Sequence, residues 1–242
     1  MNDTDIEKNA VQWIRRPANK RLIIDKFASL SDNPPPKHPV VAFMAGSPGA
    51  GKSEFVKDFR KSLELVVGSA SVVIDPDAVR EMLPGYTGNN SYLFQRAISI
   101  AFDDLFHSVL KNNQAAIIDS TLSDYKRAQQ NIKLVLNKYS AVFISYIFQH
   151  PAIAWRFTQL REVVEGRNIR KSDFIDRFIG SKETVDKLKQ ELGDRVLLNL
   201  VLKDYKDTQY NKAVAKVFTN VNSVEECINF PYTKESLERL LK

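Results

Sequence analysis

The chain has 242 residues, of which 43% are apolar, so it can bury one full hydrophobic core and carry a small appendage. Its formal net charge of +6, from 35 basic and 29 acidic residues, is too modest to require a nucleic acid or a membrane as partner. The single cysteine excludes an intramolecular disulfide, and a polar, acidic start without any long apolar run predicts a cytoplasmic protein with no signal peptide or membrane span.

Two helices are predicted before residue 40. Thr4-Asp5-Ile6-Glu7 has the pattern of a capping box, so a first helix is expected from there until Pro17 interrupts it. A second helix is expected over Asn19 to Leu30, because its apolar residues fall close to one face. Residues 31–39 contain four prolines and predict a stiff connector, since proline neither continues a helix nor donates within a central strand.

From residue 40 onward, apolar runs alternate with helical stretches. The expected strands are Val40 to Met44, Ser71 to Ile74, Ala115 to Ile118, Val142 to Phe148, Val196 to Leu202 and, more weakly, Lys216 to Val221. The expected helices lie near Glu54 to Leu65, Ala78 to Leu83, Ser91 to Lys111, Asp124 to Asn137, Pro151 to Glu165 and Ser172 to Leu192. Runs that are apolar on both faces predict a parallel sheet covered by helices on each side, a three-layer α/β fold. We therefore expect an N-terminal helical extension with its connector, 1–39, and one α/β domain, 40–242, with a lid region at about 151–192.

A phosphate-binding loop follows the first expected strand. The pattern G-x-x-x-x-G-K-S is complete in Gly46, Ser47, Pro48, Gly49, Ala50, Gly51, Lys52 and Ser53. A strand that turns through glycines into a helix start directs backbone N–H groups and the helix dipole at one point, which suits a polyphosphate. These eight residues therefore predict a nucleotide site, in which Lys52 reaches the β- and γ-phosphates and Ser53 offers its hydroxyl to Mg²⁺.

The second strand ends in acidic residues, at the edge of the sheet where ligands gather. Asp77 stands where a helix N-cap belongs, and capping is one explanation for it. The same position lies across the cleft from the phosphate loop, so Asp77 is also predicted to orient an acceptor hydroxyl and take its proton. Asp75 would be near enough to serve Mg²⁺ through water.

The third strand ends in Asp119, which is predicted to be the carboxylate on the Mg²⁺ side. The next residue is Ser120 rather than Glu, which argues against an ATPase that activates water. Guanine specificity lacks support too, because Asn137-Lys138 is not followed by a recognition Asp. A kinase that uses ATP and Mg²⁺ on a small hydroxylated acceptor is therefore favoured.

An arginine-rich stretch lies between Trp155 and Ser172. It is either a solvated helix face or a lid whose guanidinium groups stabilise the charge that develops on the γ-phosphate. With the phosphate loop present we favour the lid. Gly166 is expected to end the helix, and Arg156 and Arg167 are the pair predicted to act on the phosphate.

Taken together, these motifs resemble the zeta toxin family of phosphate-loop kinases over about Val40 to Leu192. The motifs that carry the resemblance are Phe43 to Ser53, Ile74 to Tyr86, Ile118-Asp119-Ser120-Thr121 and Glu165-Gly166-Arg167-Asn168-Ile169. The resemblance implies a toxin that transfers the ATP γ-phosphate to the 3′-hydroxyl of a UDP-N-acetyl-sugar. It also implies inhibition either by a small helical antitoxin that covers the ATP site or by the protein's own N-terminal helices.

By position, the resemblance makes Asp77 the catalytic base, Lys52 and Ser53 the nucleotide and Mg²⁺ contacts, and Arg156 and Arg167 the phosphate clamp. The substrate side is assigned to Asp77, Arg80 and Thr121. The sequence departs from the founding toxins at Asp119 and Asp103, which replace Glu, and at Arg170, which replaces Pro.

Two alternatives stay open at this stage. A 5′-hydroxyl polynucleotide kinase would share the loop, the Asp and the arginine lid, although no basic and aromatic groove segment supports nucleic acid binding. A non-catalytic module gated by nucleotide would bind ATP without turnover and dock a partner on the N-terminal helices.

Overall fold

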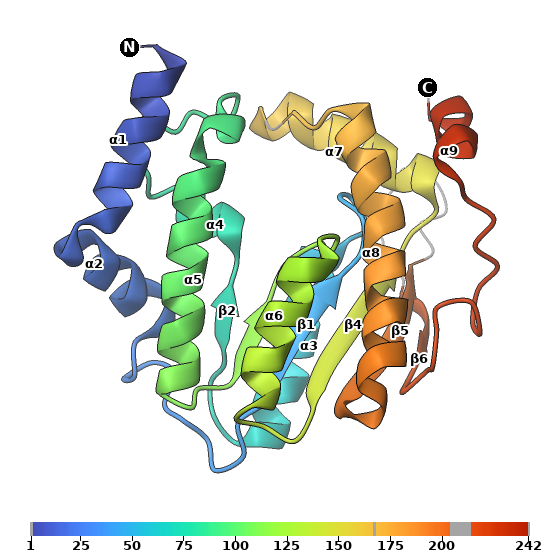
Figure 1. The fold of residues 1–242 in the computed structure, drawn as a ribbon, viewed down its shortest axis with the longest axis horizontal. Coiled ribbons are helices and arrows are strands. Elements are labelled where there is room, and N and C mark those ends of the chain that lie inside the picture. Colours follow the sequence, from blue (N-terminus) through green and yellow to red (C-terminus); the bar gives the residue numbers. More distant parts are fainter. Residues whose placement is uncertain (1, 167, 204–213, 242) are drawn as a thin grey trace.

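The computed structural model describes residues 2–166, 168–203 and 214–241, and this part of the chain forms a six-stranded sheet flanked by helices (Figure 1). The strands are β1 Val41–Ala45, β2 Val72–Ile74, β3 Ala116–Ile118, β4 Val142–Phe148, β5 Val196–Lys203 and β6 Val214–Phe218, in the order β2-β3-β1-β4-β5-β6. The first five are parallel, as predicted, but β6 is antiparallel to β5 and begins before the expected Lys216. The sheet is therefore mixed at one edge.

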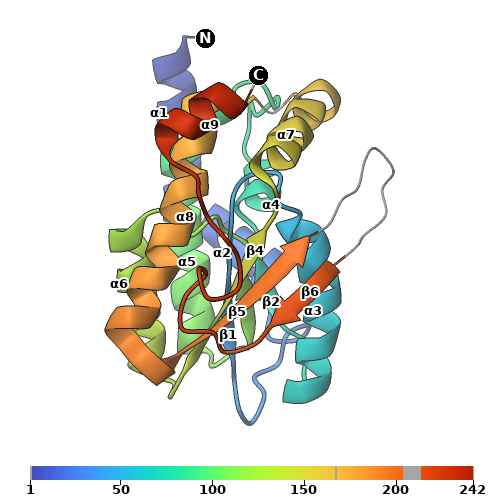
Figure 2. The same cartoon turned by 90° about the vertical axis from the view of Figure 1, so that its right-hand side faces the viewer.

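The five parallel strands are largely buried on both faces, which gives three layers. In β1, Phe43 packs on the face covered by α5 Gln95–Lys111, α6 Tyr125–Leu136 and α8 Lys171–Leu192, whereas Met44 packs on the opposite face against α3 Lys52–Val67. Figure 2 shows the sheet between these two helical layers. The predicted three-layer α/β architecture is confirmed, and the phosphate loop lies where the central strand β1 meets α3.

The two N-terminal helices pack into the same core as the sheet. They are α1 Asp3–Arg15 and α2 Pro17–Ala28, and their buried residues Ile14 and Ile23 belong to the core cluster that contains Phe43. The predicted capping box at Thr4 is wrong, because Asn2 caps α1 by accepting a hydrogen bond from Asp5 N at 2.9 Å. Pro17 does not lie between the helices but opens α2, where its fixed φ suits the first turn.

The predicted single apolar face of the second helix is only partly docked. Ile23 is buried, but Leu22 and Leu30 are half exposed, and Leu30 lies beyond the end of α2. The connector that follows is fixed by Gln114, whose Nε2 donates to Ala28 O at 3.1 Å and Asn33 O at 2.8 Å.

The remaining helices lie near the carboxyl end of the sheet, except for a 3₁₀ turn that directly precedes β5 at the opposite end. They are α4 Pro76–Arg80, the 3₁₀ turn η1 Ser91–Phe94, α7 Pro151–Glu165, the 3₁₀ turn η2 Gly193–Arg195 and α9 Lys234–Leu240, which the sequence did not predict. The bounds of β4 and α7 agree with prediction. The helix α4 begins two residues before the expected Ala78 and ends three residues before the expected Leu83. In the described part of the chain, no helix combines the length and the apolar character needed to cross a membrane.

Candidate active site

The loop between β1 and α3 depends on three glycines in the left-handed region. Gly46, Gly49 and Gly51 have φ values of +132°, +72° and +81°. A Cβ at Gly46 would lie 2.3 Å from the backbone O of Ile147, and one at Gly49 would lie 2.1 Å from the backbone O of Ala154. Other residues are excluded at Gly46 and Gly49 by both backbone conformation and space, and the positive φ of Gly51 also favours glycine, as a phosphate-binding loop requires.

Lys52 is held inside this loop. Its Nζ donates to Gly46 O at 3.0 Å and Ser47 O at 2.7 Å. Burial lowers the pKa of Lys52 to about 8; the Asp119 carboxylate opposes this shift, while the charges of Arg161 and Arg177 add to it. Three cationic side chains therefore share one small region, an arrangement that a bound polyphosphate would stabilise.

Ser53 and Asp119 meet beside the loop. Ser53 Oγ donates to Asp119 Oδ2 at 3.0 Å, and Asp119 N donates to Ile74 O at 3.0 Å, which holds the carboxylate at the end of β3. Burial raises the pKa of Asp119, and the Lys52 charge and the Ser53 hydrogen bond oppose that shift. A hydroxyl and a carboxylate at this separation are the hard oxygen donors that Mg²⁺ prefers, so the two residues fit that ion.

The described residues contain no group of three or more His, Cys, Asp or Glu side chains that could hold a metal by themselves. A Mg²⁺ ion at Ser53 and Asp119 would thus take its other ligands from phosphate oxygens and water, as is usual for this ion.

Asp77 is freed from the helix-capping role that its position suggested. Asp75 is the N-cap of α4, because its side chain accepts a hydrogen bond from Asp77 N at 2.8 Å, so the capping prediction for Asp77 is wrong. Burial raises the pKa of Asp75. The Asp77 carboxylate instead pairs with Arg80, whose side chain is only 8% exposed against 40% for that of Asp77. Arg80 therefore lies beneath Asp77 and holds it toward solvent.

Two connected hollows converge on Asp77. A cavity of about 500 Å³ is lined by Ser53, Asp75, Asp77, Ala78, Glu81, Tyr86, Thr87, Gly88 and Arg161. A larger cleft of about 1930 Å³ shares Ser53, Asp77 and Arg161 with it and extends along α5, α6, α7 and α8. Asp77 and Ser53 thus line a common space, which is where a terminal phosphate and an acceptor hydroxyl would have to meet.

The predicted residues outside the loop are distributed along this cleft. Thr121 lines it, and its Oγ1 lies 3.0 Å from Ser123 Oγ. Arg80 and Arg156 line it as well. Arg167 lies outside the described residues, so its predicted place beside Arg156 stays a prediction.

Two arginines that the sequence reasoning passed over are in the cleft. Arg161 lines both hollows and Arg177 lines the larger one, and the charges of both act on Lys52. A helical periodicity could have indicated them. Arg177 follows Asp173 by four residues in α8, and Arg161 follows Phe157 by four in α7, and all four residues line the cleft.

The sequence matches the family model described as Zeta toxin over residues 24–215. No protein of curated function matches it. Among solved structures, a chain from the PezAT chromosomal toxin–antitoxin system of Streptococcus pneumoniae is similar, with a TM-score of 0.61, 15% identity, and coverage of 92% of this chain and 86% of that one.

The AvrRxo1-ORF1:ORF2 complex is similar as well. Its native form gives a TM-score of 0.54 at 11% identity, covering 93% of this chain and 70% of that chain. The form with ATP gives 0.51 at 11% identity, covering 83% and 63%. At these identities the structures support the fold, whereas the sequence match over residues 24–215 spans most of the chain. The chain therefore belongs to the zeta toxin family of phosphate-loop kinases.

Proposed function

We propose that this protein is an ATP- and Mg²⁺-dependent kinase that transfers the γ-phosphate to a hydroxyl of a UDP-N-acetyl-sugar. The observation that carries the proposal is the shared cavity of about 500 Å³, in which Asp77 faces the phosphate-loop residue Ser53. Asp77 takes the proton of the acceptor hydroxyl, whose oxygen forms a bond to the γ-phosphorus. The bond between that phosphorus and the β,γ-bridging oxygen breaks, and ADP leaves with the bonding electrons.

The loop residues bind and orient the nucleotide. The backbone N–H groups of residues 46–53 and the start of α3 hold the phosphates, and Lys52 exchanges its two carbonyl partners for phosphate oxygens. Ser53 and Asp119 would hold Mg²⁺, which supplies charge neutralisation to the β- and γ-oxygens when bound.

Four arginines are proposed to stabilise the charge on the transferred group. Arg156 and Arg167 come from the sequence. Arg161 joins them because it lines the cavity of Asp77, and Arg177 because its charge reaches Lys52. Guanidinium groups directed at a developing charge are most effective where water is sparse.

The acceptor class follows from the family and is supported by the cleft. The volume of about 1930 Å³ extends past Asp77 to Thr121 and Arg127, which leaves room for a second substrate beside ATP. The Arg127 guanidinium lies 5.2 Å from the Phe102 ring centroid and pairs with Asp103 at 3.3 Å. A cation held on this wall is suited to an anionic acceptor such as a nucleoside diphosphate sugar.

We further propose that the protein acts as a toxin in the cytoplasm and that a small helical antitoxin inhibits it. No residue of α1 or α2 is among the described residues that line the cleft, so in this arrangement the N-terminal helices do not cover the phosphate loop. This favours a separate inhibitor over self-inhibition. Co-purification of the inactive Asp77→Asn variant with products of the neighbouring reading frames would identify that inhibitor.

The test is incubation with ATP, Mg²⁺ and UDP-N-acetylglucosamine, followed by mass spectrometry of the products. We expect Asp77→Asn to lower kcat by about 10²- to 10⁴-fold, the usual range for general base catalysis, with little effect on ATP binding. Asp58→Asn is the matched control, because Asp58 is a 70%-exposed acid on α3.

Full activity of Asp77→Asn would contradict the assigned base. Absence of a phosphorylated sugar nucleotide would overturn the acceptor. Phosphorylation of a 5′-hydroxyl oligonucleotide in its place would support the polynucleotide kinase, and tight ATP binding without any turnover would support the non-catalytic module.

A further inference from the structure

The chain returns to the lid after the last strand. From β6 it runs along the outside of α8 and ends in α9, which lies against the first turns of α8 (Figure 2). We call residues 221–241 the C-terminal segment. The family match ends at residue 215, so this segment lies outside the matched region.

The C-terminal segment follows α8 over most of its length in the opposite direction. Val224 N donates to Asp186 Oδ1 at 2.7 Å near one end of α8, and Lys171 Nζ donates to Glu238 O at 2.7 Å near the other. Between them Lys234 pairs with Asp176 at 2.6 Å. These contacts attach α8 to the segment at three places along the helix.

An aromatic cluster fills the space between the segment and α8. The Phe178 ring stacks on Phe230 at 5.4 Å and meets the edge of Tyr232 at 5.4 Å. Leu237 of α9 is completely buried in the same apolar cluster as Phe174 and Phe178. Fully burying a leucine contributes about 1.5–3 kcal/mol, so the cluster is a firm attachment rather than a surface contact.

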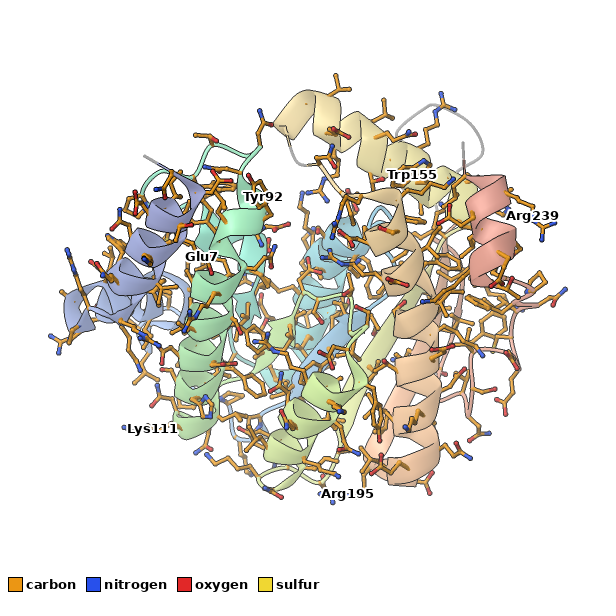
Figure 3. The ribbon with its side chains drawn as sticks, turned by 45° about the horizontal axis from the view of Figure 1, so that its top comes forward. Glu7, Tyr92, Lys111, Trp155, Arg195 and Arg239 are labelled. Carbon is orange, nitrogen blue, oxygen red and sulfur yellow. The ribbon has the colours of Figure 1, made fainter. Side chains whose placement is uncertain are left out.

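The cluster also reaches α7. Trp155 lies where α7 meets α8 (Figure 3), and its ring is 5.3 Å from that of Phe174. Ala154, the preceding residue, is fully buried in the cluster, and its backbone O lies 2.1 Å from the position that a Cβ on Gly49 would take. The attachment thus continues from α9 through α7 to the phosphate loop.

A neighbouring face of α8 lines the cleft. Asp173, Asp176 and Arg177 line it, whereas Phe174 and Phe178 point to the aromatic cluster. At about 100° per residue these two sets are centred about 120° apart on the helix. Asp176 belongs to both surfaces, because it lines the cleft and pairs with Lys234, so the segment contacts α8 directly beside the face that carries Arg177. A shift of α8 would move Arg177 with it.

We propose that the C-terminal segment is a positioning element for phosphoryl transfer, which holds α8 and α7 so that Arg177 and Arg161 reach the phosphate bound at Lys52. This proposal rests on the proposed function for its kinetic readout. It assigns no chemical step to the segment. Leu237, Phe230 and Lys234 act through the lid helices and are positioning residues.

The test is Leu237→Asp, which places a carboxylate in the apolar cluster and detaches α9. Leu240→Asp is the matched control, because Leu240 is in the same helix and 40% exposed. All variants carry Trp13→Phe, so that Trp155 is the one tryptophan that reports; the chain has two. Detachment is measured by a red shift of the Trp155 emission and by faster hydrogen exchange of the amides of residues 171–180.

We expect Leu237→Asp to lower kcat by about ten- to a hundredfold, because misplacement of a catalytic group by about 1 Å has effects of that size. The ATP dissociation constant should stay within about twofold, since the loop contacts of Lys52 are untouched. A mere loss of fold would weaken ATP binding and kcat together. Leu237→Met should restore kcat, and Leu240→Asp should match the parent.

A detached segment with unchanged kcat would overturn the proposal, and so would parallel losses of ATP affinity and kcat. If Leu237→Asp unfolds the chain, Leu237→Ala replaces it with the same expectations. If the parent protein phosphorylates no acceptor, the proposed function fails by itself. The hydrogen-exchange rate of the α8 amides then tests the positioning role. Equal rates in Leu237→Asp and Leu240→Asp would refute it.

Discussion

The Lys52 ammonium lies inside the phosphate loop, where it donates hydrogen bonds to two backbone carbonyls. Burial lowers the pKa of Lys52 to about 8. Because the unfolded chain binds more protons between pH 8 and the ordinary lysine pKa, this group makes the nucleotide-free fold gain stability as pH rises through that window. Below pH 8 the charged lysine is held at a cost, which a phosphate would offset.

ATP affinity should consequently fall as pH rises from 7.5 to 9.5. Phosphate binds the charged lysine, so its pKa is higher in the complex, and binding takes up a proton above pH 8. The expected slope approaches about tenfold in dissociation constant per pH unit, measured by calorimetry. Lys52→Arg stays charged over this range and should give a flat profile. Parallel slopes in the two proteins would show that another group titrates.

Residue roles were predictable where they depend on neighbours in the sequence. The loop around Lys52 and the place of Asp119 at a strand end follow from short patterns. Periodicity puts Arg161 and Arg177 on the same helix faces as Phe157 and Asp173. They were missed because the orientation of those faces toward the cleft depends on how α7 and α8 pack on the aromatic cluster, which involves Phe230, far along the chain. Asp77 was predicted as an N-cap because two acids flank Pro76, and Pro76 occupies the first turn.

At the scale of elements, α8 approaches the loop after β3 at Gly180. A Cβ there would lie 2.9 Å from the backbone O of Ser123, and backbone cannot move aside as a side chain can. Gly180→Ala gains about 1 kcal/mol in helix propensity but costs about 1–3 kcal/mol in overpacking. We therefore expect net destabilisation in a denaturant melt and a higher KM for the acceptor, because Ser123 lines the cleft.

The control for Gly180→Ala is Gln190→Ala, an exposed position on the same helix, which changes helix propensity without entering that contact. A more stable Gly180→Ala protein with an unchanged KM would show that α8 is free to move away from the loop.

Long, strongly patterned elements were predictable from the sequence, and short ones were not. The bounds of β4 and α7 follow from an apolar run and from Pro151 and Gly166 at the ends of the helix. The helix α9 has seven residues, and its capping box pairs Thr233 with Ser236 rather than with Glu or Gln. The antiparallel direction of β6 was hidden because an apolar run looks the same in either direction.

On the scale of the whole molecule, Gln114 joins the N-terminal helices to the sheet. It is completely buried, and its Nε2 donates to carbonyls of Ala28 and Asn33. Gln114→Leu leaves both carbonyls without that donor, at a cost of about 1–3 kcal/mol each. We expect a thermal midpoint lower by about 5 °C or more.

The thermal midpoint is measured by circular dichroism, with the exposed Gln130→Leu as control. An unchanged midpoint would mean that water satisfies these carbonyls. Ile14 and Ile23 lie in the core cluster of Phe43, so the division of the chain at residue 39 stays a prediction, and a single cooperative transition would argue against it.

The direction of β6 determines how far the rest of the chain can reach. β5 ends at the carboxyl end of the parallel strands, where the cleft lies, and β6 runs back toward the opposite end of the sheet. The C-terminal segment then runs back toward the cleft end of the molecule along α8 (Figure 2). Because β6 is reversed, the C-terminal segment, which is remote in sequence from the phosphate loop, contacts the helices that line the cleft.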